Sequence, residues 1–356
     1  MATNSFDSND DKTGTRNNKK LKNRKLKRIR LLIFFIFFEL IFSAVSAPII
    51  VFYGPFTNLK KIVIGTAMST KSHQFIAKLF LSDKSINDIL NGGDVPASNA
   101  ISQKLDAINL GKHDNTITVK QVKGRKFSGK LMIVNDPTRV RVGYSSKLGV
   151  QGEKTSQIAK EYGAIAAING GGFYDKAQNS SVIWTGTGAF PTGVIMKDGK
   201  LVFPKEAIDS KADLDGDVAA IRKDGMLIVG KHSLDFLKNN NVRDAITFGP
   251  TLIVDGVPQT RDSKGNNINN QGAQPRTAIG QTKDGKILLL VIDGRQGFQA
   301  GATIKDVQDT MMQEGAYNAV NLDGGASTTM YYNGKVINSP CDKYGERTIP
   351  TIIYVK

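Results

Sequence analysis

A long apolar run close to the N-terminus constrains this chain more than any other feature of its sequence. Leu31 to Phe52 holds 22 residues with a single charged side chain, Glu39. As an α-helix rising about 1.5 Å per residue, the run would measure about 33 Å, enough to cross the ~30 Å hydrocarbon core of a membrane. The strongly basic block from Lys19 to Arg30 precedes it. This order predicts a single-pass protein of the cell membrane, with a cytoplasmic N-terminus and an extracytoplasmic C-terminal domain.

A cleavable signal peptide is the alternative interpretation of the same run. Val45-Ser46-Ala47 has small residues at the spacing of a cleavage site, although Pro48 would directly follow the cut. We favour an uncleaved signal-anchor. Glu39 then marks a tilted or shallow position of the helix in the membrane.

Charge and cysteine content argue against several classes of protein. The net charge is +16, but residues 1–30 hold ten basic and three acidic residues and carry +7 of it. The remaining excess is spread over 326 residues, so nucleic-acid binding has little support. Cys341 is the single cysteine, which excludes an intramolecular disulfide framework and a cysteine-based zinc site.

Composition and periodicity divide the chain into four expected regions. They are a basic disordered cytoplasmic tail (1–30), a transmembrane anchor (31–53), a spacer or stalk with short helices (54–128) and a folded C-terminal domain (129–356). Within the stalk, Ser72 to Leu81 and Lys84 to Gly92 have the spacing of amphipathic helices.

The C-terminal domain has the pattern of an α+β fold with a largely antiparallel or mixed β-sheet and a few flanking helices. Two helices are expected, at Thr155 to Tyr162 and Ile304 to Glu314. Short apolar runs predict strands at 131–134, 139–144, 218–222, 246–254 and 286–293. Five dipeptides suited to tight type I′ turns separate such runs: Asp198-Gly199, Asp224-Gly225, Asp255-Gly256, Asp284-Gly285 and Asn333-Gly334.

One pattern occurs twice: a helix, a short apolar strand, a polar residue and then glycines. Ala164 to Asn169 leads into Gly170-Gly171-Gly172, and Tyr317 to Asp323 leads into Gly324-Gly325. Glycines after a buried strand form a tight turn or let a ligand approach main-chain N–H groups. Because the pattern is repeated, we expect a shared pocket built from two strand ends.

Polar residues near these strand ends are candidates for chemistry. Asp323 lies at one strand end with Ser327 just beyond it, and Asn169 and Phe173 offer an amide and an aromatic face at the other. Pro275-Arg276-Thr277-Ala278 and Asp293-Gly294-Arg295 lie between them, and the two arginines could hold an anion bidentately.

The order of these motifs resembles the phosphodiester glycosidase family. The matching motifs are N-G-G-x-F, P-R-T-A, D-G-R and N-L-D-G-G, followed by Gly345-Glu346-Arg347. The family includes the enzyme that uncovers mannose 6-phosphate by removing N-acetylglucosamine, and many bacterial proteins named exopolysaccharide biosynthesis proteins. The resemblance covers about Leu131 to Lys356. Ala326 departs from it where the family commonly has another glycine.

The resemblance implies a hydrolase that cleaves the bond between a sugar and a phosphodiester. It implies Asp323, and after it Asp293, as the catalytic carboxylate. The residues it implies for substrate binding are Asn169, Gly170, Gly171, Phe173, Arg276, Thr277, Arg295, Gly324, Gly325, Ser327 and Arg347. We expect action on cell-envelope glycan or exopolysaccharide, with a glycan or sugar phosphate as partner and no nucleic acid.

Several alternatives stay open at this point. The protein could instead be a non-catalytic glycan-binding or assembly protein for exopolysaccharide or wall polymer. No cofactor is certain; Ca²⁺ is a candidate at Asp213-Leu214-Asp215-Gly216-Asp217, where a solvated acidic turn is the favoured interpretation. Trp184 is either a sugar platform or a core residue. The sugar, the stereochemical course and the oligomeric state are not indicated by the sequence.

Overall fold

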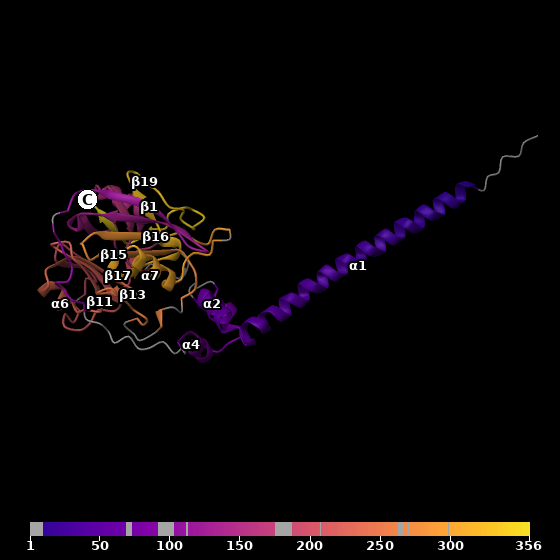
Figure 1. The fold of residues 1–356 in the computed structure, drawn as a ribbon, viewed down its shortest axis with the longest axis horizontal. Coiled ribbons are helices and arrows are strands. Elements are labelled where there is room, and N and C mark those ends of the chain that lie inside the picture. The colour runs from indigo at the N-terminus through magenta and orange to yellow at the C-terminus, as the bar shows by residue number, and fades with distance from the viewer. Residues whose placement is uncertain are drawn as a thin grey trace, which may run out of the picture. The chain divides into compact units, whose positions relative to one another are not determined.

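The computed structural model describes residues 10–68, 73–91, 103–111, 113–174, 187–206, 208–262, 267–268, 271–297 and 299–356. The chain divides into two compact units, Met1–Lys60 and Lys61–Lys356. Figure 1 shows the elements of both. Trp184 lies outside the described residues.

The first unit is built on one long helix, α1 (Asp10–Tyr53). Its part from Lys25 to Tyr53 is long and apolar enough to cross a membrane, by length and composition, as a signal sequence would also be. The apolar helix expected at 31–53 is therefore present. The helix also continues back through 10–30, where the sequence predicted disorder. Lys, Arg and Leu are good helix formers, and adding residues to an existing helix avoids the cost of a new nucleus.

The region expected to be a stalk contains three short helices and then joins the sheets. The helices are α2 (Thr57–Met68), α3 (Gln74–Lys78) and α4 (Asp83–Asn91). Further on, the buried side chain of Gln103 hydrogen-bonds the main chain of the later strand β11 (Leu227–Gly230), donating to Leu227 O at 2.9 Å and accepting from Val229 N at 2.8 Å. The sheets begin at β1 (Ile117–Lys123), ahead of the expected boundary at 129.

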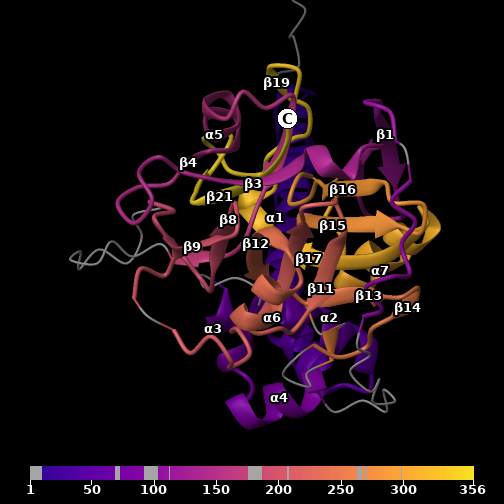
Figure 2. The same ribbon diagram turned by 90° about the vertical axis from the view of Figure 1, so that its left-hand side faces the viewer.

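In the described part of the second unit, three large antiparallel sheets hold most of the strands. The seven-stranded sheet has the order β1, β2 (Ser128–Val134), β16 (Ile287–Ile292), β15 (Arg276–Thr282), β17 (Ala316–Leu322), β13 (Thr251–Val254) and β14 (Val257–Pro258). Figure 2 shows the run from β16 to β14 in this order.

The other two sheets have five strands each. One has the order β11 (Leu227–Gly230), β10 (Asp217–Arg222), β12 (Val242–Phe248), β8 (Ile195–Lys197) and β9 (Lys200–Phe203). The other has the order β19 (Lys335–Val336), β18 (Met330–Tyr332), β5 (Ala166–Asn169), β21 (Thr351–Val355) and β3 (Val140–Tyr144). Two ribbons pair β4 (Glu153–Lys154) with β20 (Thr348–Ile349), and β6 (Phe173–Tyr174) with β7 (Phe190–Pro191).

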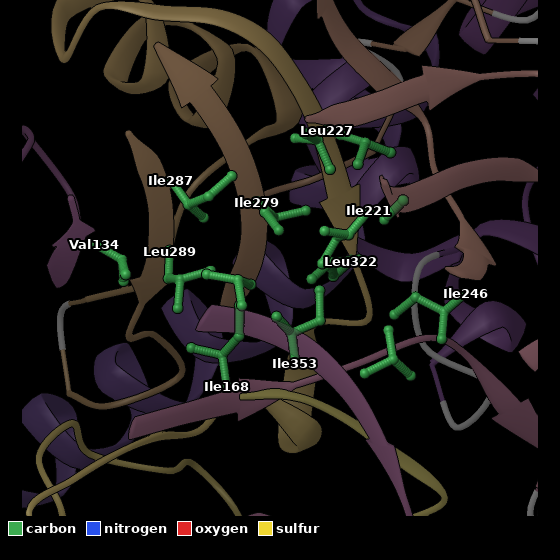
Figure 3. Packing of buried hydrophobic residues seen from close by; sticks show 14 of the residues in the cluster. Val134, Ile168, Ile221, Leu227, Ile246, Ile279, Ile287, Leu289, Leu322 and Ile353 are labelled. Atoms are coloured by element: carbon green, nitrogen blue, oxygen red, sulfur yellow. The ribbon is translucent and has the colours of Figure 1, made fainter. Parts of the chain in front are cut away.

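All three sheets contribute to one hydrophobic core. Figure 3 shows Leu289 and Ile279 of the first sheet, Ile221 and Ile246 of the second, and Ile168 of the third converging. Each is at most 1% exposed. Burying one such aliphatic side chain stabilises the fold by about 1.5–3 kcal/mol, so the sheets depend on one another for stability.

Helices cover the outer faces of this core. In α7 (Ile304–Gln313), Val307 and Met311 are buried against the seven-stranded sheet. A capping box starts the helix: Asp306 N donates to Thr303 Oγ1 at 3.1 Å, and Thr303 N to Asp306 Oδ2 at 2.8 Å. Among the described residues, this unit also contains α5 (Thr155–Glu161), α6 (Leu234–Asn239) and the 3₁₀ turns η1 (Pro137–Arg139) and η3 (Gly325–Ser327). The expected α+β fold with mostly antiparallel sheets is confirmed.

The predicted turns differ in type. Asp198-Gly199, Asp255-Gly256 and Asn333-Gly334 have positive φ at both residues, as a type I′ turn requires. At Asp224-Gly225 and Asp284-Gly285 the glycine alone has positive φ. These two turns are therefore not type I′, although they connect hairpin strands as expected.

Candidate functional site

Three strand ends meet at one edge of the seven-stranded sheet. β15 begins at Arg276, opposite Ile292 at the end of β16, and its next residue, Thr277, lies opposite Leu322 at the end of β17. Asp293 and Asp323 each follow the last residue of these flanking strands. Since neighbouring strands lie about 4.8 Å apart, the register places the two aspartate backbones about 10 Å from each other.

Asn169 connects this edge to the third sheet. It is 1% exposed and ends β5. Its Nδ2 donates to Asp323 O at 2.6 Å, and its Oδ1 accepts from Thr277 Oγ1 at 2.7 Å and from Thr329 N at 3.2 Å. Asp323 N in turn donates to Gly170 O at 3.2 Å. The two copies of the repeated strand-end pattern are therefore joined by hydrogen bonds.

The glycines at these strand ends are packed against other backbone. A Cβ on Gly170 would lie 2.8 Å from Thr351 O, and one on Gly324 would lie 2.6 Å from Pro275 O. Gly170 N donates to Thr351 O at 2.9 Å, and Gly325 N donates to Pro275 O at 2.8 Å. These main-chain N–H groups are engaged within the protein, so the close approach that requires glycine is between chain segments.

Gly171 is also packed against other backbone, and its N–H is bonded within the protein. Its N–H donates to Thr351 Oγ1 at 2.9 Å, and a Cβ there would lie 2.9 Å from Thr247 O of β12. The turn after β5 thus touches the second sheet as well as the third. All three sheets take part in shaping the site.

Burial and hydrogen bonding act in opposite directions on the pKa of the Asp293 carboxyl. It is partly buried, and its Oδ1 accepts from Asn338 Nδ2 at 2.9 Å and from Ser339 N at 3.0 Å. Burial raises the pKa of the Asp293 carboxyl, while these two donors and the charge of Lys130 act in the opposite direction.

Asp323 has its backbone fixed on both sides, since its N–H donates to Gly170 and its carbonyl accepts from Asn169. The residue is partly exposed. It directly precedes the Gly324-Gly325 turn and the 3₁₀ turn η3. A carboxylate is thus carried at the edge where β5, β15 and β17 meet.

Arg276 is placed differently from the expected anion clamp. It is 2% exposed, and its guanidinium donates to Ala302 O at 3.1 Å, Gln271 Oε1 at 2.8 Å and Gly272 O at 2.8 Å. Burial, with a further contribution from the charge of Arg295, lowers the pKa of Arg276 to about 9. Its position at the first residue of β15, across from buried Ile292, directs it toward the α7 side of the sheet.

Arg295 is the exposed arginine of the pair. It has a φ of 57°, and its Nη2 donates to Gln274 Oε1 at 3.0 Å. Its Nη1 lies 3.4 Å from the position that a Cβ on Gly325 would occupy. Burial raises the pKa of the neighbouring Cys341 thiol, and the charge of Arg295 opposes that rise. Arg295 thus offers a cation beside the glycine turn that follows Asp323.

The remaining predicted binding residues fall into two groups. Thr277 and Ser327 are buried, and Thr277 donates its hydroxyl to Asn169. Phe173 and Arg347 form a separate pair, in which the Arg347 Cζ lies 5.1 Å from the ring centroid of Phe173. This cation–π pair joins the first glycine motif to the late Gly-Glu-Arg motif.

In the acidic run 213–217, the carboxylate of Asp217 is buried and hydrogen-bonded within the protein. Asp217 is 3% exposed, and its Oδ2 accepts from Thr251 N at 2.6 Å and Thr251 Oγ1 at 2.9 Å. In the part of the chain that the structure describes, no group of three or more His, Cys, Asp or Glu side chains is placed to hold a metal ion. Asp217 serves to fix the segment after the cis Gly249-Pro250 bond.

Two asparagines of the site were missed by the sequence analysis. Asn338 bonds Asp293, and Asn321 Nδ2 donates to Gly249 O at 3.0 Å, next to the strand end of Asp323. Asn321 stands two residues before Asp323 inside the N-L-D-G-G motif, so the motif itself could have pointed to it. Asn338 lies in a polar loop and has no such signal.

Comparison with known proteins agrees with the motif order. The sequence model of the phosphodiester glycosidase family matches residues 162–356, more than half of the chain and all the candidate site residues. The SPbeta prophage-derived uncharacterized protein YomE of Bacillus subtilis (strain 168) is 28% identical over 221 residues, which are 61% of this chain and 31% of YomE.

A vertebrate protein matches over a similar share of the chain. The N-acetylglucosamine-1-phosphodiester alpha-N-acetylglucosaminidase of Mus musculus is 27% identical over 243 residues, 63% of this chain and 43% of the mouse protein. The present chain thus spans less than half the length of these curated relatives.

A solved structure shows the same fold. It is the zebrafish N-acetylglucosamine-1-phosphodiester alpha-N-acetylglucosaminidase catalytic domain, auto-inhibited by pro-peptide. It superimposes with a TM-score of 0.52 at 24% identity, over 77% of this chain and 93% of that one. The family model matches more than half of the chain, and the motif order and the joined strand ends agree with it. The chain belongs to the phosphodiester glycosidase family.

Proposed function

We propose that this protein is a membrane-anchored extracytoplasmic hydrolase that cleaves a sugar-1-phosphodiester bond in cell-envelope glycan or exopolysaccharide metabolism. The observation that carries the proposal is the meeting of the Asp293 and Asp323 strand ends at one edge of the sheet, inside the range of the family match. Two carboxylates are what hydrolysis at an anomeric carbon requires.

Asp323 is the carboxylate we assign to the anomeric carbon, where its negative charge stabilises the transition state, with Asp293 as the second carboxylate. An oxocarbenium-like transition state is stabilised by a nearby negative charge. The leaving group is a phosphomonoester, so neutralising its charge matters more than protonating it. Arg295 is exposed beside the Gly324-Gly325 turn and supplies that charge, whereas Arg276 is engaged with three acceptors inside the protein.

Substrate class and location rest on separate observations. The mouse and zebrafish proteins are named for action on N-acetylglucosamine-1-phosphodiesters, so such a compound is the natural first substrate to test. The apolar part of α1 follows the basic block, an order that favours a location of the second unit outside the cytoplasm when α1 stays in the membrane. Envelope glycans are the phosphodiester-linked sugars that a domain in that location would meet.

The test is sugar release by the full-length protein in detergent from an N-acetylglucosamine 1-phosphodiester and from uridine diphosphate N-acetylglucosamine, with and without calcium. We expect release by wild type and at least a hundredfold loss in Asp323→Asn. Asp309→Asn is the matched control, because Asp309 pairs with Lys305 on the exposed face of α7. Wall-polymer binding by both wild type and Asp323→Asn, without release from any donor, would instead support the glycan-binding and assembly role.

A further inference from the structure

The side chain of Asn338 makes three hydrogen bonds around Asp293. Its Nδ2 donates to Asp293 Oδ1 at 2.9 Å and to Thr328 O at 3.2 Å. Its Oδ1 accepts from Met330 N at 2.7 Å. Both ends of the amide are therefore fixed by main chain, and the orientation of the donor toward Asp293 is determined by the fold.

Asn338 also connects the two carboxylate-bearing segments. Thr328 follows the turn that begins at Asp323, and Met330 opens β18. Asp293 belongs to the other strand end, after β16. One side chain thus holds the Asp293 carboxylate in a fixed place relative to the segment that carries Asp323.

Only one oxygen of Asp293 is engaged by this arrangement. Oδ1 takes both donors, from Asn338 and from Ser339 N, and among the described residues Oδ2 makes no hydrogen bond. A carboxylate held by one oxygen in this way keeps the lone pairs of its second oxygen available to accept a proton.

We propose that Asn338 is a positioning residue for the hydrolysis, holding Asp293 ionised and oriented so that Oδ2 accepts the proton of the attacking water. The inference rests on the proposed function. In the step, a bond forms between the water oxygen and the anomeric carbon, and the bond from that carbon to the phosphate oxygen breaks. Its electron pair leaves with the phosphate, and the water proton passes to Asp293.

The electrostatics of Asp293 agree with this role. Burial raises its pKa, and the Asn338 amide is the strongest of the groups that oppose the rise. Ser339 N and Lys130 of the neighbouring β2 also oppose it. Hydrogen bonds to the ionised form of a carboxyl favour that form, so loss of the Asn338 donor should raise the pKa of Asp293 further.

The experiment is the pH profile of kcat/KM for the full-length protein and its Asn338→Ala and Asn338→Asp variants. We expect the acidic limb of the profile to move upward by roughly one pH unit in Asn338→Ala, and further in Asn338→Asp because two carboxyls then face each other. Asn240→Ala is the control, because Asn240 donates to Phe236 O and touches no carboxylate. An unmoved acidic limb in both Asn338 variants overturns the proposal.

A second measurement decides the role of Asn338 even where no sugar is released. The difference in unfolding free energy between wild type and Asp293→Asn, followed from pH 3 to pH 8, reports the pKa of Asp293 in the folded protein. A raised folded pKa means that ionisation of Asp293 lowers stability as pH rises. In the Asn338→Ala background this loss should be larger, and an identical loss in both backgrounds contradicts the proposal. If no sugar is released but the unfolding free energies change as expected, Asn338 still controls the ionisation of Asp293, and the hydrolase assignment is refuted.

Discussion

The side-chain amide of Asn169 donates a 2.6 Å hydrogen bond to the main-chain carbonyl of Asp323, and this bond joins two sheets at the site. The sequence analysis assigned the Asn169 amide to substrate. Both of its polar atoms are instead bonded to protein, since Oδ1 accepts from Thr277 and Thr329. Asn169 therefore holds the main chain of the segment that carries Asp323.

Asn169→Asp should therefore lower both stability and activity. The substitution removes the donor to Asp323 O and adds a negative charge facing that carbonyl, in a residue that is 1% exposed. We expect a loss of about 2–4 kcal/mol in unfolding free energy, measured by chemical denaturation. Thr277→Val, which removes one donor to Asn169 and keeps the shape of the side chain, should cost about 1 kcal/mol. Equal stability of Asn169→Asp and wild type would refute the supporting role.

The two arginines should behave in opposite ways. Arg276→Lys leaves the buried carbonyl acceptors of Ala302 and Gly272 without the planar guanidinium, so it should destabilise the fold by about 2–4 kcal/mol. Arg295 lies on the surface, so Arg295→Gln should change the unfolding free energy by less than about 0.5 kcal/mol. It should raise KM for a phosphodiester substrate on the order of tenfold, because a charge-assisted contact to phosphate is lost. Unfolding and steady-state kinetics together separate the two effects.

Gly324→Ala should disturb the site without straining its own backbone. Gly324 has a φ of −120°, which any residue adopts, but an added Cβ would lie 2.6 Å from Pro275 O. The turn after Asp323 must shift to relieve this contact, and we expect a loss of about 1–3 kcal/mol with a marked fall in kcat. Gly111→Ala is the control, because its Cβ would meet a movable side-chain oxygen of Asn109 at 3.3 Å. Crystallography of Gly324→Ala should show the displaced Asp323.

A buried ion-pair cluster predicts how stability changes in acid. Asp244 is 0% exposed and accepts from Arg141 Nε at 2.8 Å and Arg243 Nε at 3.0 Å. Burial alone would raise the pKa of Asp244, but the Asp198 N–H and the two arginines outweigh it and lower that pKa below the ordinary value of 3.8. The contribution of Asp244 is therefore complete above about pH 4 and is lost as pH falls through the folded pKa.

Asp244→Asn should remove this acid dependence and cost about 3–5 kcal/mol at neutral pH, because a fully buried carboxylate is lost from two half-buried guanidinium groups. Thermal unfolding from pH 2.5 to pH 7 measures both effects. Replacement of the exposed Asp309 in the same way should cost at most about 1 kcal/mol. A parallel acid profile for Asp244→Asn and wild type would show that another group controls the acid limb.

The proposed topology can be tested with thiol labelling in intact cells. With Cys341 replaced by Ser, Val150→Cys provides an accessible thiol, because Val150 is 75% exposed. A membrane-impermeant maleimide should label Val150→Cys from outside and leave Ser5→Cys in the basic tail unlabelled until the cells are opened. Labelling of the two positions in the reverse order would contradict an extracytoplasmic second unit.

Much of the fold was predictable because its signals are local. The apolar run before Tyr53, the helix at Ile304 and the strand at Lys286 each carry their own periodicity, and the structure contains all of them. β1 was not predicted, because Ile117 to Lys123 carries lysine and glutamine at exposed positions of an outer strand. Such a strand is defined by its pairing with β2, which is not a local property.

The site was predictable in position but not in the roles of its residues. The repeated strand-glycine pattern identified the joined ends of β5 and β17, and the family match confirms the resemblance based on it. Sequence cannot show on which face the first residue of a strand lies, which is why Arg276 was expected beside Arg295. It also cannot show that Asn338, 45 residues after Asp293, bonds that carboxylate.

The position of β21 affects when the candidate site can assemble during folding. β21 lies between β5 and β3 in its sheet, and Thr351 at its start accepts from both Gly170 N and Gly171 N. The turn after Asn169 therefore lacks its partner until the ribosome has added Val355. A chain in which β21 has not yet paired holds both aspartates without the strand that fixes the turn after Asn169, so the order of the site depends on the insertion of β21 between β5 and β3.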